Sequence, residues 1–448
     1  MMLGGFQREA GKRLRVASSL LVALAAAAVA AAPVAPPSAL EVVLSASTRA
    51  PAPMVPVDPA TGKKVGNNLE LSARLGPLTA ITALCFSADG QTLYVGSYAR
   101  VAVWDLRTGK VDRFLQGVEG AVDALKLSPD GARLAVGGGL PARSGVVLLY
   151  DGKHPTRPLA RLKGHADVVY GLDFSPDSRR LATASFDKLV KVWDLQTGKE
   201  QFVIKRHSDQ VYAVAFSPDG KLIASAGKDQ SVKLFDAATG KGRRTLTGHS
   251  RPILSLAFSA DGKQVLSAGE ESQIRSWTVA DGKNIRRANG HSGGINELTL
   301  SRDRQVMASV GSDKRVHLWN PAQGKQTKVL NGAGEELFAV ALSPDGKRVA
   351  AGGFAGIVRL WDIASGRVLA AAFTAPAATP APEYLTMTPE GYYTASPGVA
   401  AVAHWRIGGQ PAPDAPLRKA LLQPAEVARS LAGAKVSPVK ITPPPVKE

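Results

Sequence analysis

Short strand-like runs, in which hydrophobic positions alternate with smaller or polar ones, recur along most of the chain. Val211–Phe216 and Ser231–Phe235 are two such runs. A period of two is typical of half-buried β-strands and not of helices. Turn sequences of two kinds separate the runs, Ser217-Pro-Asp-Gly220 and Thr239-Gly-Lys241 among them, and they carry the residues that tight turns favour. The pattern predicts many short antiparallel strands joined by tight turns.

Large aromatic residues mark the repeat that organises these strands. Eight of them, here called node aromatics, lie 42 to 46 residues apart, and a Ser-x-Asp turn or a variant of it stands 17 or 18 residues before seven of them. Fixed spacing of this length is the signature of a repeat architecture. Eight units of four strands are therefore predicted. The node aromatics are Trp104, Tyr150, Trp193, Phe235, Trp277, Trp319, Trp361 and Trp405.

The units resemble the WD40 repeat family. Trp193-Asp194 and Trp361-Asp362 match the dipeptide that names the family, and Gly164-His165, Gly248-His249 and Gly290-His291 match its second signature. The resemblance implies an all-β β-propeller over residues 69–410, with eight four-stranded blades stacked radially around a channel. In that arrangement Leu69 to Leu75 is the outer strand of the last blade and closes the ring. The alternative is a seven-bladed ring with the last unit packed outside it.

The two ends of the chain differ in composition from the repeats. Residues 1–32 combine a basic stretch with an apolar run and an Ala-Val-Ala cleavage pattern, which predicts a signal peptide or, alternatively, a membrane anchor. Residues 33–68 are rich in Pro and Ala and predict a linker, with a short strand possible at Leu40 to Leu44. Residues 411–448 form a tail with a short helix and a Pro-rich end. Residues 388–431 resemble the ending of exported bacterial WD40 proteins, often of planctomycete-like lineages, and we expect a periplasmic or cell-envelope protein.

A histidine, a hydroxyl residue and a carboxylate recur at fixed spacing before the node aromatic in four consecutive units. The set looks like a hydrolytic triad, but a catalytic constellation occurs once in a chain. In WD40 proteins it forms a structural hydrogen-bond chain inside each blade, so the resemblance implies a structural role. The units without the histidine should be the looser blades. These tetrads are His165, Thr183, Asp187 and Trp193; His207, Ser225 and Asp229, with Phe235 at the node; His249, Ser267, Glu271 and Trp277; and His291, Ser309, Asp313 and Trp319.

Other candidate chemistry is sparse. Cys85 is the only cysteine and lies in a strand-like run, where a buried small hydrophobe is expected. His154, His317 and His404 are isolated, with no metal-binding spacing, and no phosphate-loop motif occurs. We therefore expect no catalytic residue, no metal site, no cofactor and no enzymatic activity, and a propeller enzyme ranks third among the functions considered.

Aromatic residues also stand at two positions of the polar face that carries the tetrad loops. Tyr170, Tyr212 and Phe338 follow the first apolar residue of an inner strand, and Phe186 and Phe354 precede the position of the tetrad carboxylate. Exposed aromatics often anchor a protein partner. The alternative is that these rings pack on one another over the channel mouth.

These features predict an exported, monomeric scaffold that binds protein partners on the face carrying the tetrad loops. The rival function is polyanion binding, because the chain carries a net charge of +18 and lysines recur in the turns of the opposite face. Contact with a membrane is expected only if the N-terminal segment is not cleaved. The lysines are Lys110, Lys199, Lys221, Lys241, Lys263, Lys283, Lys325 and Lys347.

Overall fold

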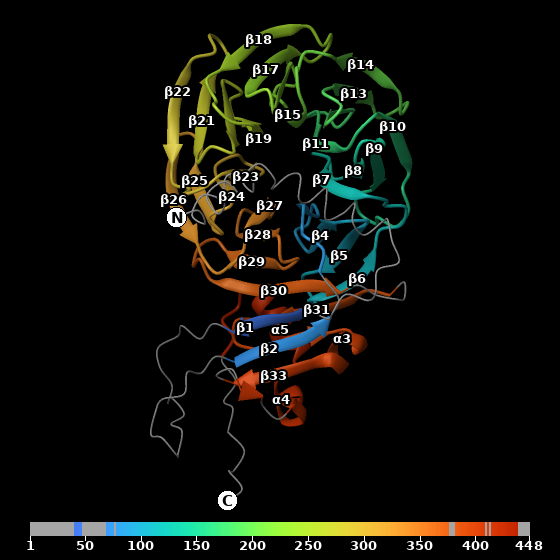
Figure 1. Cartoon of the computed structure of the whole chain (residues 1–448), viewed down its shortest axis with the longest axis vertical. Helices are drawn as coiled ribbons and strands as arrows, with labels where there is room; N and C mark the ends of the chain where they lie inside the picture. The colour runs from blue at the N-terminus through green and yellow to red at the C-terminus, as the bar shows by residue number, and fades with distance from the viewer. Residues whose placement is uncertain are drawn as a thin grey trace, which may run out of the picture. The chain divides into compact units, whose positions relative to one another are not determined.

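The computed structural model describes residues 40–46, 69–75, 78–375, 381–407, 410–411 and 414–437. Seven antiparallel blades form a ring around a central channel (Figure 1). Each blade has four strands in chain order, with the first strand lining the channel; the fourth strand is the outermost in blades 1 to 6.

The strand bounds repeat with little variation from blade to blade. Blades 1 and 2 contain β3 (Ala83–Phe86), β4 (Thr92–Ser97), β5 (Arg100–Asp105) and β6 (Lys110–Phe114), then β7 (Ala121–Leu127), β8 (Arg133–Leu140), β9 (Ser144–Asp151) and β10 (Ala160–His165). Blades 3 and 4 contain β11 (Val169–Phe174), β12 (Arg180–Ser185), β13 (Val190–Asp194) and β14 (Glu200–Ile204), then β15 (Val211–Phe216), β16 (Leu222–Gly227), β17 (Ser231–Asp236) and β18 (Gly242–Thr247). Blades 5 and 6 contain β19 (Ile253–Phe258), β20 (Gln264–Gly269), β21 (Gln273–Thr278) and β22 (Asn284–Asn289), then β23 (Ile295–Leu300), β24 (Met307–Gly311), β25 (Val316–Asn320) and β26 (Lys325–Leu330). Blade 7 contains β27 (Leu337–Leu342), β28 (Arg348–Gly353), β29 (Val358–Asp362) and β30 (Val368–Ala375).

Burial falls from the channel to the rim of each blade. In blade 4 every residue of β15 is buried, whereas β18 has one buried residue, Leu246. The inner strands are covered by the two neighbouring blades, so they tolerate apolar residues on both faces, and the outer strands keep the polar residues that water requires.

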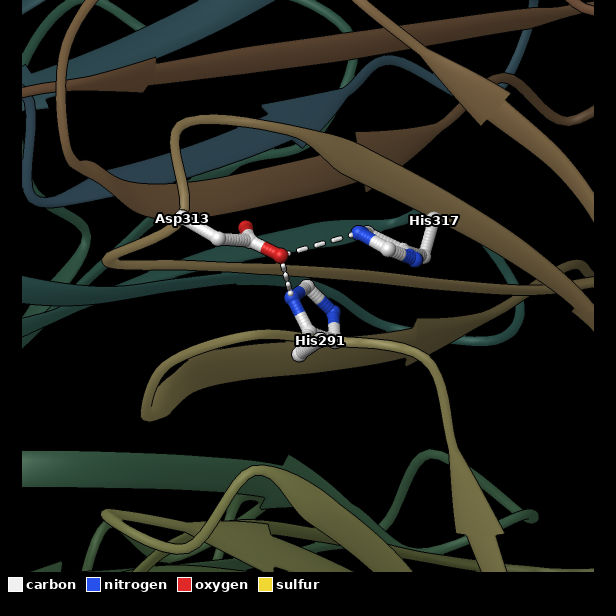
Figure 2. Close-up of side chains that lie close together, drawn as sticks. All are labelled: His291, Asp313 and His317. Atoms are coloured by element: carbon white, nitrogen blue, oxygen red, sulfur yellow. Dashed lines mark hydrogen bonds and ion pairs between the residues drawn. The ribbon is translucent and has the colours of Figure 1, made fainter.

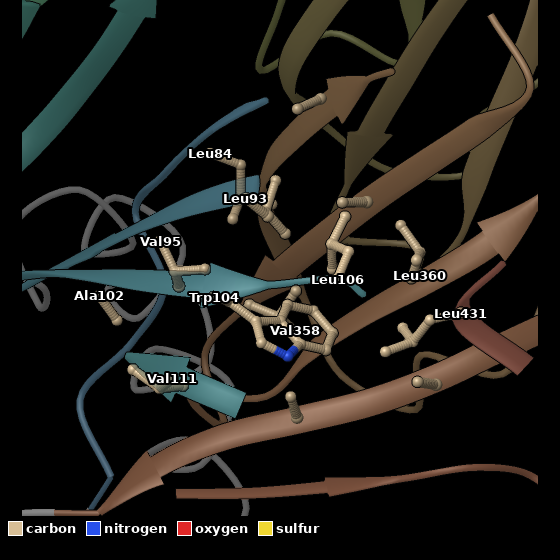
Figure 3. Packing of buried hydrophobic residues seen from close by; sticks show 14 of the residues in the cluster. Leu84, Leu93, Val95, Ala102, Trp104, Leu106, Val111, Val358, Leu360 and Leu431 are labelled. Carbon is tan, nitrogen blue, oxygen red and sulfur yellow. The ribbon is translucent and has the colours of Figure 1, made fainter. Parts of the chain in front are cut away.

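The prediction of eight blades is wrong, because the ring closes with seven, as the alternative of a seven-bladed ring had it. Blade 7 packs directly against blade 1, and the backbone N–H of Ile81 donates to the carbonyl of Gly353 at 2.9 Å. Figure 3 shows the hydrophobic core of this seam, in which Leu93 and Trp104 of blade 1 face Val358 and Leu360 of blade 7. The four-stranded blades of an all-β propeller were predicted correctly.

The eighth unit is split between two sheets. Its first strands, β31 (Glu383–Met387) and β32 (Tyr393–Ala395), extend blade 7 beyond β30. The helix α3 (Pro397–Val402) then carries the chain to a separate sheet, where β33 (Ala403–Ile407) pairs with β2 (Leu69–Leu75). The remaining strands of that sheet are β1 (Leu40–Ala46) and β34 (Gln410–Pro411).

Leu69 to Leu75 pairs with the strand of Trp405, as predicted. The prediction that this pair completes a blade of the ring is wrong. Leu71 lies opposite Trp405, as the repeat predicts, yet blade 7 already owns an outer strand in β30. Pro397 opens α3 where the second and third strands of a blade would form a hairpin, so the unit cannot assemble as a blade. β1 lies inside the range expected to be linker, at the place where a short strand was expected.

Two helices follow the last sheet, α4 (Asp414–Leu421) and α5 (Pro424–Leu431). α5 covers the seam between blades 7 and 1: Val427 and Leu431 are buried in the same core as Trp104, and Ser430 Oγ donates to the carbonyl of Leu369 at 2.6 Å. The segment thus belongs to the propeller core and is not a free tail. Among the described residues no helix is long and apolar enough to cross a membrane, and the expected signal segment, residues 1–32, lies outside them.

Candidate functional site

The tetrad of blade 3 ties the loop before β11 to the middle of the blade. Trp193 Nε1 donates to Thr183 Oγ1 at 3.0 Å, and the same oxygen lies 2.7 Å from His165 Nε2. His165 Nδ1 lies 2.8 Å from Asp187 Oδ2, which also accepts the backbone N–H of Ala166. The chain satisfies buried polar groups that would otherwise be unpaired.

The structure brings the other predicted tetrads together in the same way. The distances from histidine Nδ1 to carboxylate are 2.9, 3.1 and 2.9 Å in blades 4, 5 and 6, and those from Nε2 to the serine hydroxyl are 2.7 Å in all three. Trp277 and Trp319 each complete the chain at 2.8 Å, whereas Phe235 has no N–H and leaves blade 4 one bond shorter. The members are His207, Ser225 and Asp229; His249, Ser267, Glu271 and Trp277; and His291, Ser309, Asp313 and Trp319.

The glycine before the tetrad histidine makes room for the node tryptophan. A Cβ on Gly248 would meet the indole of Trp277 at 3.2 Å, and its φ of +145° is one that other residues rarely adopt. Blade 4 has Arg206 at this position, where the node is the smaller Phe235. The departure from the family pattern thus has a steric explanation.

A second feature of the tetrads escaped the sequence analysis. The residue two places before the node is basic or histidine in blades 3 to 7 and lies beside a carboxylate. Lys233 Nζ lies 2.8 Å from Asp229, Arg275 Nη2 lies 2.9 Å from Glu271, and Arg359 Nη1 lies 3.1 Å from Glu335. The periodicity alone could have revealed this set, which we call the cation position: Lys191, Lys233, Arg275, His317 and Arg359.

The sequence predicted that His317 is isolated, and this prediction is wrong. Its Nε2 lies 3.0 Å from Asp313 Oδ2, the atom that His291 Nδ1 also approaches (Figure 2). His154 and His404 lie outside this network.

Burial and hydrogen bonding shift the pKa values of the histidine and the carboxylate in the tetrad of blade 5. Burial lowers the pKa of His249 to about 4, although Glu271 partly opposes the shift. Burial alone would raise the pKa of Glu271, but hydrogen bonds from Ser250 and the charges of His249 and Arg275 outweigh it and lower the pKa to about 2. Near neutral pH the pair is a neutral imidazole and a carboxylate, and both nitrogens of that imidazole are engaged in hydrogen bonds, with Glu271 and with Ser267.

The three predicted aromatics nearest one another form a packed cluster. The Tyr170 ring lies 5.4 Å from Phe186 and 5.3 Å from Tyr212, and Phe186 lies 5.5 Å from Tyr212. Tyr212 is buried, whereas Tyr170 and Phe186 are half-buried. Distances near 5 Å are those of aromatic pairs that stabilise a fold, so part of their surface is committed to packing.

Phe338 and Phe354 lie on blade 7 and belong to different environments. Phe338 is half-buried and lines the channel, whereas Phe354 is 68% exposed on the loop between β28 and β29. Phe354 is therefore the predicted aromatic with the most surface free for a partner.

The central channel holds a cavity of about 500 Å³ whose wall includes acidic groups. Burial raises the pKa of Asp123 to about 7, and it does the same for Glu297, although the backbone N–H of Val340 and the charge of Lys126 partly oppose it. Lys126 Nζ lies 3.5 Å from Asp173. Burial also raises the pKa of Cys85 to about 11, so this thiol is not a nucleophile near neutral pH.

Six segments of the chain match the family model WD40, described as WD domain, G-beta repeat: residues 70–105, 156–194, 198–236, 240–278, 282–320 and 324–362. Together these segments cover more than half of the chain. The chain belongs to the WD40 family. The first match begins within β2, so the WD40 model takes as an outer strand the segment that this propeller places in a separate sheet.

The similar curated proteins match over short stretches. Transcription factor unc-37 of Caenorhabditis elegans is 36% identical over 25% of this chain and 18% of its own length. The small ribosomal subunit protein RACK1y of Oryza sativa is 37% identical over 24% of this chain and 30% of its own, and protein groucho of Drosophila melanogaster is 32% identical over 25% and 15%. The chain thus spans less than a third of the length of each relative. The names of these relatives describe different roles. The similarity therefore indicates a shared repeat and not a shared activity.

Proposed function

We propose that this WD40 propeller is a non-catalytic scaffold that binds a protein partner on the face carrying the tetrad loops. The observation that carries the proposal is Phe354, a large apolar side chain 68% exposed on that face. Burying such a ring against a partner contributes roughly 1.5–3 kcal/mol, and interface anchors are often aromatic. The half-buried edges of Tyr170 and Phe186 extend the same face.

A matched pair of substitutions tests this proposal. Leu159 is also 68% exposed, but it precedes the outer strand of blade 2. Partner capture from the cell envelope of the source organism should fall on Phe354→Ala and persist on Leu159→Ala, with both variants as stable as the parent. Equal capture by both variants would exclude Phe354 as the anchor.

Export is the second part of the proposal. It rests on the composition of residues 1–32, a basic stretch followed by an apolar run and Ala28-Val29-Ala30. Mass spectrometry of the protein from its own host should find a mature N-terminus near Ala31 outside the cytoplasm. An intact Met1 on protein in the cytoplasm would remove export, and an intact Met1 on membranes would favour an anchor.

A further inference from the structure

The cation position of blade 6 differs from that of its neighbours in the same ring. In blades 4 and 5 a permanent cation, Lys233 or Arg275, lies beside the tetrad carboxylate. Blade 6 has His317 in that place, against Asp313. The side chains of His291, Asp313 and His317 are 0, 2 and 1% exposed, so water does not screen this carboxylate.

The atoms that converge there are metal ligands by type and spacing. His291 Nδ1, His317 Nε2 and an oxygen of Asp313 lie within 4.8 Å of one another. Figure 2 shows both rings directed at the same carboxylate oxygen. A tetrahedral zinc ion with bonds of about 2.0–2.1 Å needs ligand atoms about 3.3 Å apart, and the nitrogen–oxygen distances are now 2.9 and 3.0 Å. A shift of a few tenths of an ångström in the loop that carries Asp313 would open the site.

The surrounding hydrogen bonds hold the other nitrogen of each ring, so the nitrogens that face an ion are those now hydrogen-bonded to Asp313. Gln326 Oε1 lies 3.0 Å from His317 Nδ1, so that nitrogen donates a proton and Nε2 faces Asp313. Ser309 Oγ lies 2.7 Å from His291 Nε2 and orients that ring. Metal-bound histidines usually have their second nitrogen held in this manner.

Asp313 also has more free capacity than its counterpart in blade 4. Its Oδ1 accepts only the backbone N–H of Arg315, at 3.3 Å, among the described residues. The Oδ1 of Asp229 accepts both the backbone N–H and the hydroxyl of Ser231, at 3.2 and 2.8 Å. The carboxylate of Asp313 is therefore held by fewer hydrogen bonds than that of Asp229 and can turn toward an ion at a smaller cost.

We propose that His291, Asp313 and His317 form a buried site for a divalent transition metal, with Zn²⁺ the ion that best suits two imidazoles and a carboxylate. The ion takes the place of the cation that Lys233 and Arg275 supply in the adjacent blades. Its role is to hold the loop before β23 against the loop between β24 and β25.

The test uses the full chain treated with EDTA, then titrated with ZnCl₂ at pH 7.5 and followed by calorimetry and thermal unfolding. We expect about one ion per chain and a rise in Tm. His317→Lys copies blade 4, so it should fold and lose the zinc response. Gln326→Ala should weaken zinc binding about 10- to 100-fold, because it only orients His317.

Blade 4 provides a gain-of-function control. Lys233→His gives it the same three side chains, with His207 and Asp229, and should add a second, weaker zinc equivalent. CoCl₂ in place of zinc should give the visible bands of a tetrahedral nitrogen–oxygen site in the parent and not in His317→Lys.

Three results would overturn the proposal. One is a zinc response of the same size in His317→Lys, which would mean an adventitious surface ion only. Another is no zinc binding to the parent. The third is a parent protein that does not respond to zinc and whose Tm in zinc-free buffer falls as the pH rises, while the Tm of His317→Lys does not fall. The cation beside Asp313 would then be protonated His317 itself.

Discussion

At the scale of single residues, the node tryptophans show how one side chain serves in three hydrogen-bonding environments. Trp277 Nε1 donates to Ser267 Oγ at 2.8 Å, and Trp361 Nε1 donates to the carbonyl of Asn331 at 3.1 Å. Trp104 Nε1 is buried without a partner among the described residues, because Tyr94 stands where a tetrad has its hydroxyl. The indole ring is thus retained for its volume, and the hydrogen bond is secondary.

This difference predicts unequal costs for the same substitution. Both Trp104→Phe and Trp277→Phe remove the same volume from a fully buried site. Trp277→Phe also leaves Ser267 short of a donor, so it should lower the free energy of unfolding by about 1 kcal/mol more. Urea denaturation of the two variants measures the difference. Equal losses would mean that the tetrad bond to the indole contributes nothing to stability.

Asp123 predicts a stability that depends on pH in a defined direction. Its folded pKa of about 7 lies above its ordinary value of 3.8, so the folded chain binds the proton more tightly. The loss of folding stability caused by ionising the buried carboxyl group is absent below about pH 4 and grows as the pH rises to 7. Asp123→Asn should therefore stabilise the protein at pH 8, by on the order of 1 kcal/mol, and have little effect near pH 4. Thermal unfolding at the two pH values checks this, and a gain at pH 4 as large as that at pH 8 would contradict it.

At the scale of elements, each blade is continuous in sequence and neighbouring blades meet side by side. Arginines at the first position of a blade's second strand, Arg180 of β12 and Arg348 of β28, bridge two of these seams. Arg180 donates to the carbonyls of Gly220 and Ala237 of blade 4, and Arg348 of blade 7 donates to that of Gly90 of blade 1, at 2.7 Å. Blades 3 and 4 are also joined by the chain, whereas blades 7 and 1 are not, so the second seam depends on such contacts and on α5.

Removing each arginine should therefore have different local effects. Arg348→Met should speed amide hydrogen exchange in β3, in β27 and at Ile81, which precedes β3, because no covalent link joins the two blades at this seam. Arg180→Met is the matched control and should leave the seam between blades 3 and 4 nearly as protected as before. Equal loosening of both seams would show that the chain link between blades is irrelevant to their contact.

Much of this organisation could be predicted from the sequence, because the repeat fixes it. Strand order within a blade and the positions of the tetrad residues follow from spacing. The structural role of the tetrads and the partner of Leu69 to Leu75 follow from the resemblance to the WD40 family. The number of blades could not be predicted from the spacing. Seven blades already close the ring, and the spacing does not show whether the unit of Trp405 is one of them. The sequence analysis missed the cation position of His317 because blades 3, 4, 5 and 7 have Lys or Arg there, and a histidine was not compared with them.

At the scale of the whole molecule, the net charge is +18, but the lysines that recur in the turns are partly neutralised by neighbouring carboxylates. The turn lysines stand beside turn aspartates: Lys283 lies 3.2 Å from Asp281 and Lys221 lies 4.0 Å from Asp219. These pairs are exposed and individually weak, but they reduce the field that a polyanion would feel.

Binding to heparin should therefore be weak and lost by about 0.15 M salt. Retention on a heparin column in a salt gradient measures it, with lysozyme as a basic reference protein. Elution well above physiological salt would favour polyanion binding as the function. Partner capture that survives the same salt would favour the protein scaffold.

The continuity of each blade bears on how the chain reaches its native state. Every ladder within the seven blades pairs residues near one another in sequence, so hairpins can form and stack as soon as they are synthesised, at little loop-closure cost. The union of β27 with β3 is different, because it joins residues from the two ends of the ring and cannot begin until most of the chain is made. We expect that step to be the slowest, because it closes the longest loop, and until it occurs the growing stack should expose the apolar flanks of its first and last blades. Folding of this propeller is therefore expected to be limited by closure, and chains halted before β27 would be the ones prone to aggregate.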